Sequence, residues 1–257
     1  MLSVFVMATA AISSPAWAQD PAVLVPAEPD VVVVNLPTAM RMPLFRGNFR
    51  LTHRFGGNLR NGSFSEQAGN LFGLDQGAII GFEYRMAVAR DVQAAFYRSS
   101  FAKTIQLYGK YDGLRQRGSM PVSVSGLISI EGANNFQEQF APAVGAVISR
   151  LVGTRIAAYV TPMWVDNTQD SRSTTYVGFG GRVRIAGSTY VAAEVAVRAG
   201  GYAPDEAAYG FSLEKRAGGH TFSLTFTNTF GTTFAQMARG GAANSLYLGF
   251  NLSRKFF

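Results

Sequence analysis

Two histidines, His53 and His220, carry the side chains best suited to acid–base chemistry in this sequence. A histidine-based hydrolase needs a nucleophilic serine beside the imidazole and a polar group that orients the ring. The alternate positions around His53 hold Leu51 and Phe55, and Phe222 stands two residues beyond His220. Both histidines therefore share the apolar parity of an extended strand. We expect them to anchor strand ends at an interface, and we predict no catalytic residue and no enzyme.

One stretch of oxygen-bearing side chains, WVDNTQDSRS, offers Asp166, Asn167, Asp170 and Ser171 as calcium ligands. Their spacing lacks the order of ligands and the closing glutamate of an EF-hand loop. Loops rich in Asp and Asn more commonly form turns, because their side chains bond to nearby backbone groups. We therefore predict neither a metal site nor a bound cofactor.

A cluster of glycines, Gly178, Gly180 and Gly181, lies within GFGGR, where no helical pattern follows to complete a phosphate loop. Glycine inside a strand relieves crowding or lets a barrel wall bend. The arginines are spread over many segments rather than gathered in one basic patch, which argues against nucleic acid as a partner.

The composition indicates a chain low in charge. Of its 257 residues 15% are charged, whereas soluble domains average about 25%. The formal net charge is +7, and cysteine is absent, which excludes disulfides, thiol catalysis and cysteine-ligated metals.

The first 43 residues differ from the rest of the chain. Residues 1–18 end in an A-x-A-like site, Ala16-Trp17-Ala18, and we expect a secretory signal peptide here although its basic region is missing. Residues 19–43, the lead-in, hold five of the ten prolines and are expected to be extended and periplasmic. The valine run 31–34 is suited to a short strand or to packing inside something hollow, so the lead-in is also a possible plug.

From residue 44 onward, apolar and polar side chains alternate with the period of two that is typical of strands. In GHTFSLTFTNTF, large apolar residues take turns with small hydroxyl-bearing ones. We predict twelve strands, at about 44–55, 77–86, 89–98, 102–111, 120–131, 140–151, 154–164, 174–185, 188–198, 207–215, 219–229 and 245–257.

Alternation alone fits a soluble sandwich or a membrane barrel, and three features favour the membrane. Short connections alternate with long ones such as 56–76 and 230–244, charges on the apolar parity fall at strand ends, and aromatic residues gather there too. We therefore predict an all-β, antiparallel, up-and-down transmembrane barrel of about 12 strands in residues 44–257. Representative side chains expected to face lipid are Phe222, Leu224, Phe226, Leu248, Phe250 and Phe256.

The chain ends in LGFNLSRKFF, an alternating strand with terminal aromatics like those that barrel-assembly machinery reads. The residue in phase with Leu248 and Phe250 is Phe256 rather than the terminal Phe257. We expect the assembly machinery and outer-membrane lipid as partners, with an unidentified protein partner also open.

Five runs, VVNLPTAMRM, GNFRLTHRFG, FGLDQGAIIGFEYR, GHTFSLTFTNTFGTT and LGFNLSRKF, resemble a bacterial β-barrel family known as a domain of unknown function (5777 type). The likeness covers about residues 31–257, and its most specific pieces are His53–Gly56 and 219–233. It implies an exported barrel in the outer membrane of a Gram-negative bacterium. The family has no agreed activity, so the resemblance supplies no catalytic residues.

The charges on the polar parity are expected to line the lumen, with nine cations against five anions. They are Arg46, Arg50, Arg54, Glu83, Arg85, Asp91, Lys110, Glu131, Arg155, Arg182, Arg184, Glu194, Arg198 and Glu214. Eight strands leave an interior that side chains fill and sixteen leave a water channel, so twelve does not decide between the two.

Two functions therefore stay open. The first is a narrow, porin-like passive channel in which the excess of arginine weakly favours small anionic solutes. The second is a closed, non-conducting barrel that serves as a scaffold or docking partner for a periplasmic or surface protein. A lead-in folded back into the lumen, or opposite charges on neighbouring strands, would favour closure. The loop 56–76 suits either a constriction or a partner-binding surface.

Overall fold

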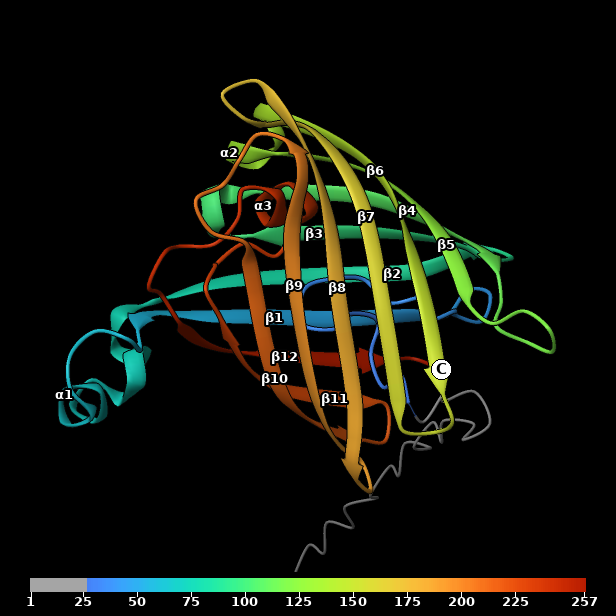
Figure 1. The fold of residues 1–257 in the computed structure, drawn as a ribbon, viewed down its shortest axis with the longest axis horizontal. Helices are drawn as coiled ribbons and strands as arrows, with labels where there is room; N and C mark the ends of the chain where they lie inside the picture. The colour runs from blue at the N-terminus through green and yellow to red at the C-terminus, as the bar shows by residue number, and fades with distance from the viewer. Residues whose placement is uncertain (1–26) are drawn as a thin grey trace, which may run out of the picture.

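The computed structural model describes residues 27–257, so the predicted signal peptide and residues 19–26 lie outside the described part. The described chain forms a closed antiparallel barrel of twelve strands (Figure 1). Each strand pairs with its neighbour in the sequence, and β12 closes the sheet on β1. This confirms the predicted fold class and strand number.

The strands lie within a few residues of their predicted positions. They are β1 (Gly47–Asn58), β2 (Ala78–Ala89), β3 (Val92–Ser99), β4 (Ile105–Leu114), β5 (Ser123–Gly132), β6 (Glu138–Val152), β7 (Ile156–Gln169), β8 (Arg172–Ala186), β9 (Thr189–Gly201), β10 (Ala208–Ala217), β11 (His220–Thr227) and β12 (Tyr247–Lys255). The largest difference is at the end of β7, which the sequence placed at residue 164. It runs on to Gln169 because β7 and β8 form one long hairpin.

The helical segments are short and lie in connections. They are α1 (Phe64–Gly69), α2 (Ala133–Phe136) and α3 (Phe234–Ala238), with the 3₁₀ turns η1 (Leu71–Gln76) and η2 (Phe101–Lys103). In the part of the chain that the structure describes, none of the helices combines the length and the apolar character needed to cross a membrane.

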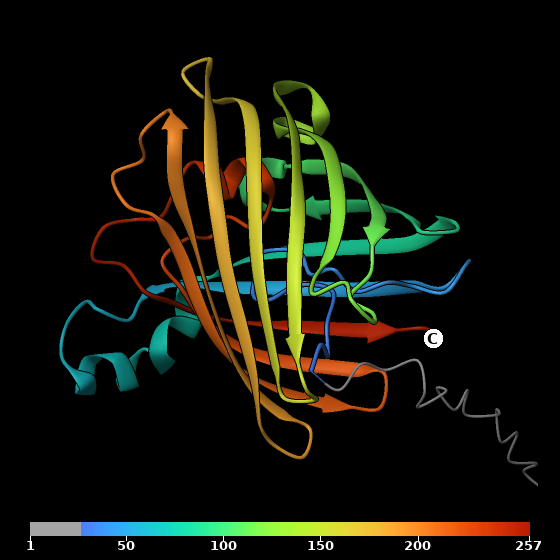
Figure 2. The same cartoon turned by 45° about the vertical axis from the view of Figure 1, so that its right-hand side comes forward.

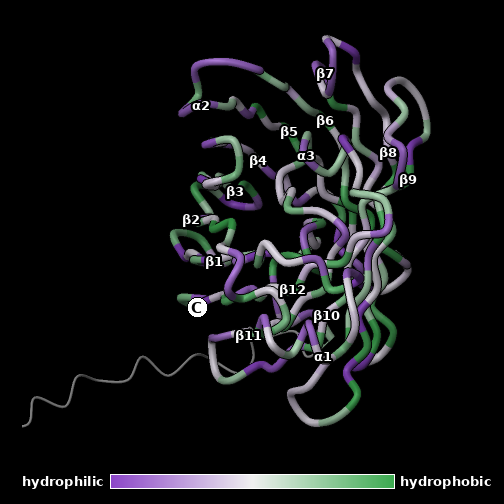
Figure 3. The backbone as a smooth tube through the Cα atoms, turned by 90° about the vertical axis from the view of Figure 1, so that its left-hand side faces the viewer, coloured by the Kyte–Doolittle hydropathy of each residue, from purple (hydrophilic) through white to green (hydrophobic). Residues whose placement is uncertain are grey.

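Side-chain alternation places polar groups inside the barrel and apolar groups outside. In β11, Thr221 and Thr225 are fully buried, whereas the side chains of Phe222 and Leu224 are 51% and 45% exposed. The same parity puts Phe256 outside at 47% exposure. Figure 3 shows the resulting repeated change between hydrophilic and hydrophobic residues along the strands.

The remaining residues of the predicted outer face are partly covered by outward neighbours. Phe226 stacks on Phe211 at a centroid distance of 5.0 Å, and Phe250 stacks on His53 at 4.9 Å. Leu248 is likewise half-buried.

The connections at the two barrel ends are less regular in length than the sequence indicated. At the end that holds both the start of β1 and the end of β12, the connections are 90–91, 115–122, 153–155, 187–188 and 218–219. At the opposite end the loop 59–77, with α1 and η1, extends away from the barrel (Figure 1), but residues 170–171 form only a tight turn. A long connection therefore occurs at the first end and a short one at the second.

Candidate functional site: the filled lumen

The lumen is occupied by the lead-in. Residues 27–40 and Met42 are all buried, and we refer to residues 27–42 as the plug. In Figures 1 and 2 this blue segment runs within the barrel, behind the long strands. The plug contacts inward side chains from β1, β2, β4, β8, β9 and β12, among others, so it is enclosed on all sides rather than laid on an outer face.

The centre of the plug is a small hairpin. The N–H of Val33 donates to the carbonyl of Leu36 at 2.8 Å, and the N–H of Thr38 donates to the carbonyl of Val31 at 3.0 Å. A bridge between Val32 and Pro37 completes it. These two bonds satisfy few of its backbone groups, and buried backbone groups need partners. The wall of the barrel must supply the rest.

Glu194 of β9 binds the turn of this hairpin. Its two carboxylate oxygens accept the backbone N–H groups of Val34 at 2.9 Å, Asn35 at 2.8 Å and Leu36 at 2.9 Å. Three N–H groups converging on one anion form an anion-binding concavity of the kind that turns create. The charge of Glu194 is thereby compensated by backbone dipoles of the plug.

Wall cations and amides bind the carbonyl groups of the same turn. The guanidinium of Arg182 in β8 donates to the carbonyls of Val32 at 2.7 Å and Val33 at 3.1 Å. The amide of Asn251 in β12 donates to the carbonyl of Val34 at 2.8 Å. The turn is therefore held at both its N–H and its C=O groups.

Arg54 of β1 reaches the same turn through a side chain. Its guanidinium donates to the side-chain oxygen of Asn35 at 2.9 Å and to that of Asn251 at 2.9 Å. The two asparagines are thus linked by one cation from the neighbouring strand.

Two lysines hold the ends of the plug. Lys110 of β4 donates to the carbonyls of Met40 at 2.7 Å and Thr38 at 3.3 Å. Lys255 of β12 donates to the carbonyl of Pro29 at 2.5 Å. Pro29 also accepts from the hydroxyl of Thr221 at 3.0 Å. Both flanks of the hairpin are therefore held by buried ammonium groups.

Glycines in the wall leave room for the turn. A Cβ atom at Gly178 would lie 2.7 Å from Leu36, and one at Gly210 would lie 3.3 Å from Val34. At Gly180 the corresponding distance to the nearest atom of Val33 is 3.1 Å. A side chain at Gly178 would therefore force the side chain of Leu36 to move. Gly181 has no such neighbour, so two of the three glycines of GFGGR face the plug.

The terminal residue covers one apolar part of the plug. Val31, Val32, Met40 and Met42 form a buried cluster with Ala87 of β2, and Phe257 packs against it. The aromatic residue that is out of phase with β12 thus contacts the plug, while Phe256 points outward.

A second segment fills the lumen from the opposite end. The connection 228–246 folds inward so that every residue of α3 is buried. A capping box between Thr233 and Gln236 starts the helix, and Glu131 of β5 accepts the N–H of Ala235 at 3.3 Å. Phe234 packs edge-on against Tyr108 at 5.5 Å. α3 shares one buried apolar cluster with Val33, Leu36 and Ala39 of the plug.

Charges of opposite sign pair with each other across the wall. Arg50 and Arg85 flank Glu83 at 2.8 Å and 3.1 Å, and Arg182 pairs with Glu214 through two bonds of 2.6 Å and 3.0 Å. Every partner in these pairs is almost fully buried. Arg50 and Glu83 lie on the neighbouring strands β1 and β2, whereas Arg182 of β8 reaches Glu214 of β10 across β9. The signs are thus mixed rather than segregated around this part of the wall, which is the arrangement that favours closure.

Nine of the fourteen charges that the sequence assigned to the lumen are buried in the wall. They are Arg50, Arg54, Glu83, Arg85, Lys110, Glu131, Arg182, Glu194 and Glu214.

The other five lie at the barrel ends. Arg46, Arg155 and Arg198 are exposed, and Asp91 and Arg184 are half-buried. Arg155 and Asp91 stand in turns, beyond the last residues that can face the lumen. For Arg46, Asp91 and Arg155 the predicted alternation extended beyond the ends of the strands, whereas Arg198 lies within β9 and is exposed near its end.

The sequence reasoning missed two buried wall charges. Asp112 pairs with Lys110 at 2.9 Å, and Lys255 binds Pro29. Both have the parity of residues already assigned inward, since Asp112 follows Lys110 by two and Lys255 follows Ser253 by two. Extending the alternation by one step would have found them.

The histidines and the Asp-rich stretch have local partners. His53 lies between Phe55 and Phe250, and the Nδ1 of His220 lies 3.1 Å from a guanidinium nitrogen of Arg254. Asp170, in the β7–β8 turn, pairs with Arg172 at 3.4 Å. Within residues 27–257 no group of three or more His, Asp or Glu side chains is placed to hold a metal ion.

A family model described as "Membrane bound beta barrel domain (DUF5777)" matches residues 31–256. The chain belongs to this family. The matched region includes the hairpin of the plug as well as all twelve strands, so hairpin and barrel form one domain of a membrane protein. No curated protein matches the chain.

Solved porin structures are similar in fold. The NanC porin matches with a TM-score of 0.51 and 8% identity over 82% of this chain and 99% of that chain. Engineered variants of the Rhodopseudomonas blastica porin match with TM-scores of 0.37 and 0.38 and identities of 15% and 16%, over 69% of this chain. The match covers 55% of those longer porins. At these identities the likeness to NanC concerns the fold alone.

Proposed function

We propose that this protein is an outer-membrane barrel that its own plug keeps closed and non-conducting, and that it serves as a scaffold or docking partner. The observation that carries the proposal is the binding of the plug turn by Glu194, which accepts three backbone N–H groups from Val34, Asn35 and Leu36. Such a site is specific for this backbone conformation and is not a feature that an open water channel needs.

The filling of the lumen from both ends supports closure. The plug enters from the end with the chain terminus, α3 enters from the other, and the two meet in one buried apolar cluster. A solute would have to displace both segments to pass. The outward aromatic and aliphatic side chains, such as Phe222 and Leu224, then contact lipid, and β12 presents the chain end to the assembly machinery.

The loop 59–77 is the surface best suited to a docking partner. It extends from the barrel end opposite the terminus (Figure 1), and Phe64 and Leu71 are 78% and 55% exposed. Phe64 packs on Phe72 at 5.8 Å, which gives the loop a preformed apolar surface. A capping box at Ser63 fixes α1, and hydrogen bonds from Ser63 hold the pKa of Glu66 below its usual range.

A second candidate function is a passage for small anionic solutes that opens when the plug leaves. Five buried wall cations donate to oxygen atoms of the plug, and these are Arg54, Arg85, Lys110, Arg182 and Lys255. In the closed barrel the plug oxygens therefore take the places that an anionic solute would take. Departure of the plug would free these cations and favour anions in the passage.

Solute flux through liposomes distinguishes the two candidates. The chain beginning at residue 19 and the chain beginning at residue 43 are refolded into liposomes, and swelling is followed in arabinose and in sodium glucuronate. The proposal predicts no swelling for the longer chain. Swelling of the shorter chain that is faster in glucuronate would favour the gated passage, and none in either would favour the scaffold. Rapid swelling with the longer chain would overturn the proposed closure.

A further inference from the structure

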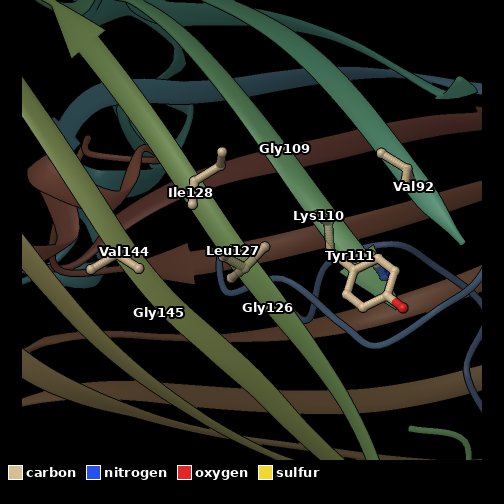
Figure 4. A pocket seen from close by; sticks show the side chains of 9 residues that line it. All are labelled: Val92, Gly109, Lys110, Tyr111, Gly126, Leu127, Ile128, Val144 and Gly145. Carbon is tan, nitrogen blue, oxygen red and sulfur yellow. The ribbon is translucent and has the colours of Figure 1, made fainter. Parts of the chain in front are cut away.

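A groove of about 310 Å³ lies on the outer face of the barrel, across β3 to β6. Figure 4 shows the side chains of Val92, Tyr111, Ile128 and Val144 around the backbone of Gly109 and Gly126. Tyr111, Ile128 and Val144 are 61%, 66% and 49% exposed, so they stand out from the wall as the rim of the groove.

Gly109 of β4 and Gly126 of β5 line the floor of this groove, and the residues paired with them on β3 and β6 are small. Gly109 pairs with Ala94 of β3, and Gly126 pairs with Ala146 of β6. All four have the parity of outward residues, since Gly109 lies midway between the exposed Leu107 and Tyr111. No atom lies within 4 Å of a Cβ built at Gly126. The concavity is therefore open space over the backbone of Gly126.

Hydrocarbon is the material that fills a concavity at this position. The chain belongs to a membrane-bound barrel family, and the outer wall of such a barrel contacts acyl chains. An unfilled groove would deprive its lining of van der Waals contacts, and no water is available there to fill it. The groove, at about 310 Å³, has room for a segment of one acyl chain.

Three exposed arginines lie in the connections of the groove strands β3, β4 and β5, at the barrel end that holds the chain terminus. Arg90 lies in the turn directly before β3 begins, and Arg115 and Arg117 lie in the connection after β4 ends. None of the three takes part in an ion pair within residues 27–257. The nearby carboxylates are already paired, Asp91 with Arg41 and Asp112 with Lys110. Unpaired positive charge thus lies where the headgroup of a seated lipid would be.

We propose that this groove binds a phospholipid with an anionic headgroup, whose acyl chain lies over Gly109 and Gly126 and whose phosphate is bound by Arg90, Arg115 and Arg117. The apolar lining of the groove binds the acyl chain of the lipid, and the arginines select a headgroup with negative charge. Tyr111, at the end of β4 between the two parts, is placed at the level where aromatic residues meet the membrane interface. The site is independent of the state of the lumen.

Trp164 provides a reporter of the lipid at this site. It pairs across β6 and β7 with Val144 on the groove rim, and its side chain is 42% exposed on the same outer face. The chain contains two tryptophans, and the second is Trp17. The experiment uses the full chain with Trp17→Phe, so that the tryptophan fluorescence comes from Trp164 alone. Phosphatidylglycerol brominated on one acyl chain is diluted in unlabelled phosphatidylcholine. The quenching of Trp164 fluorescence then measures the association of the anionic lipid with this face. Brominated phosphatidylcholine diluted in phosphatidylglycerol measures the association of the neutral lipid in the same way. The ratio of the two associations is the preference for the anionic lipid.

We expect this ratio to be about five at low ionic strength, because one arginine near the membrane surface contributes about 1 kcal/mol to the binding of an anionic lipid. The ratio should be larger if more than one arginine contacts the headgroup. Gly126→Leu fills the groove, and the triple variant with Arg90, Arg115 and Arg117 changed to Gln removes the charge. Each should bring the ratio close to one. Gly200→Leu is the matched control, because a Cβ at Gly200 also meets open space and the residue lies on β9. Heat-modifiable mobility in electrophoresis verifies that each variant folds.

Each other outcome overturns the proposal. A ratio of one in the parent chain, or a preference that survives Gly126→Leu, means that the groove holds no selected lipid. A preference that survives the triple variant removes the role of the arginines. If sedimentation shows a dimer that Gly126→Leu dissociates, the occupant of the groove is a second copy of the chain.

Discussion

Replacement of Glu194 by alanine is the perturbation that most sharply tests the binding of the plug. The carboxylate accepts three backbone N–H groups, at 2.8 to 2.9 Å, from one turn of the plug. Hydrogen bonds to a charged group contribute about 1.5 kcal/mol each at the low end, or roughly 4.5 kcal/mol for three. The variant no longer has to bury a carboxylate, and this gain offsets part of the loss of the hydrogen bonds. We therefore expect Glu194→Ala to destabilise the seated plug by about 3 kcal/mol, a shift of roughly 100-fold in the equilibrium between seated and released plug.

The assay uses the absence of cysteine from the chain. Ala39 of the plug is 7% exposed, and Ala39→Cys introduces a single buried thiol. A maleimide bearing a large polymer reacts with this thiol only when the plug leaves the lumen, so the labelling rate follows the released fraction. Glu194→Ala should raise that rate roughly 100-fold. Glu194→Gln should raise it less, because one oxygen remains for the N–H groups of Val34 and Leu36, which share Oε2.

The control for the labelling experiment is Glu66→Ala in the outer loop, whose carboxylate accepts hydrogen bonds from the backbone and hydroxyl of Ser63. It should leave the labelling rate of Ala39→Cys unchanged. Equal rates in the parent and Glu194→Ala barrels would refute the assignment of Glu194 as the residue that binds the plug.

Three further predictions concern the fit between plug and wall. A Cβ at Gly180 would lie 3.6 Å from the Cβ of Val33, which is within the range found in disulfides. The Val33→Cys/Gly180→Cys pair should therefore form a disulfide on oxidation. The cross-link is detected as a shift in electrophoretic mobility that dithiothreitol reverses. Gly178→Val should raise the labelling rate of the plug roughly tenfold, because crowding of this kind costs about 1–3 kcal/mol. Arg182→Met should lower the free energy of unfolding in urea by about 3–5 kcal/mol, since Glu214 loses its partner. Adding Glu214→Leu should restore part of this loss, because the carbonyls of Val32 and Val33 still lack the guanidinium donor.

Matched changes separate these effects from general damage. Gly200→Val, where a Cβ meets open space, should leave the labelling rate unchanged. Absence of the Val33–Gly180 cross-link in a folded barrel would contradict the position of the turn. A double variant no more stable than Arg182→Met alone would contradict the pairing with Glu214.

The barrel itself was predictable because its signal is local. A period of two places Phe222 and Leu224 on one face and Thr221 and Thr225 on the other, whatever the rest of the chain does. The same parity found most of the wall charges. It failed at Arg155, because alternation does not show where a strand gives way to a turn.

The plug could be foreseen only as one alternative, because its partners are remote in sequence. The turn at Val34 is bound by Glu194, 160 residues away, and no local pattern encodes such a contact. The glycines of GFGGR were interpreted as relieving crowding, but what they make room for becomes visible only with Val33 and Leu36 in place. α3 left a better signal, since Thr233 and Gln236 have the spacing of a capping box.

The most direct test of the account is the single-channel conductance of the barrel in planar bilayers, measured for the chain beginning at residue 19 and for the chain beginning at residue 43. With the plug seated in the lumen, we predict a flat trace for the longer chain at moderate voltage. Oxidised Val33→Cys/Gly180→Cys should be equally silent. Steady, long-lived conductance steps from the longer chain, persisting in the cross-linked barrel, would contradict the claim that residues 27–42 close this protein.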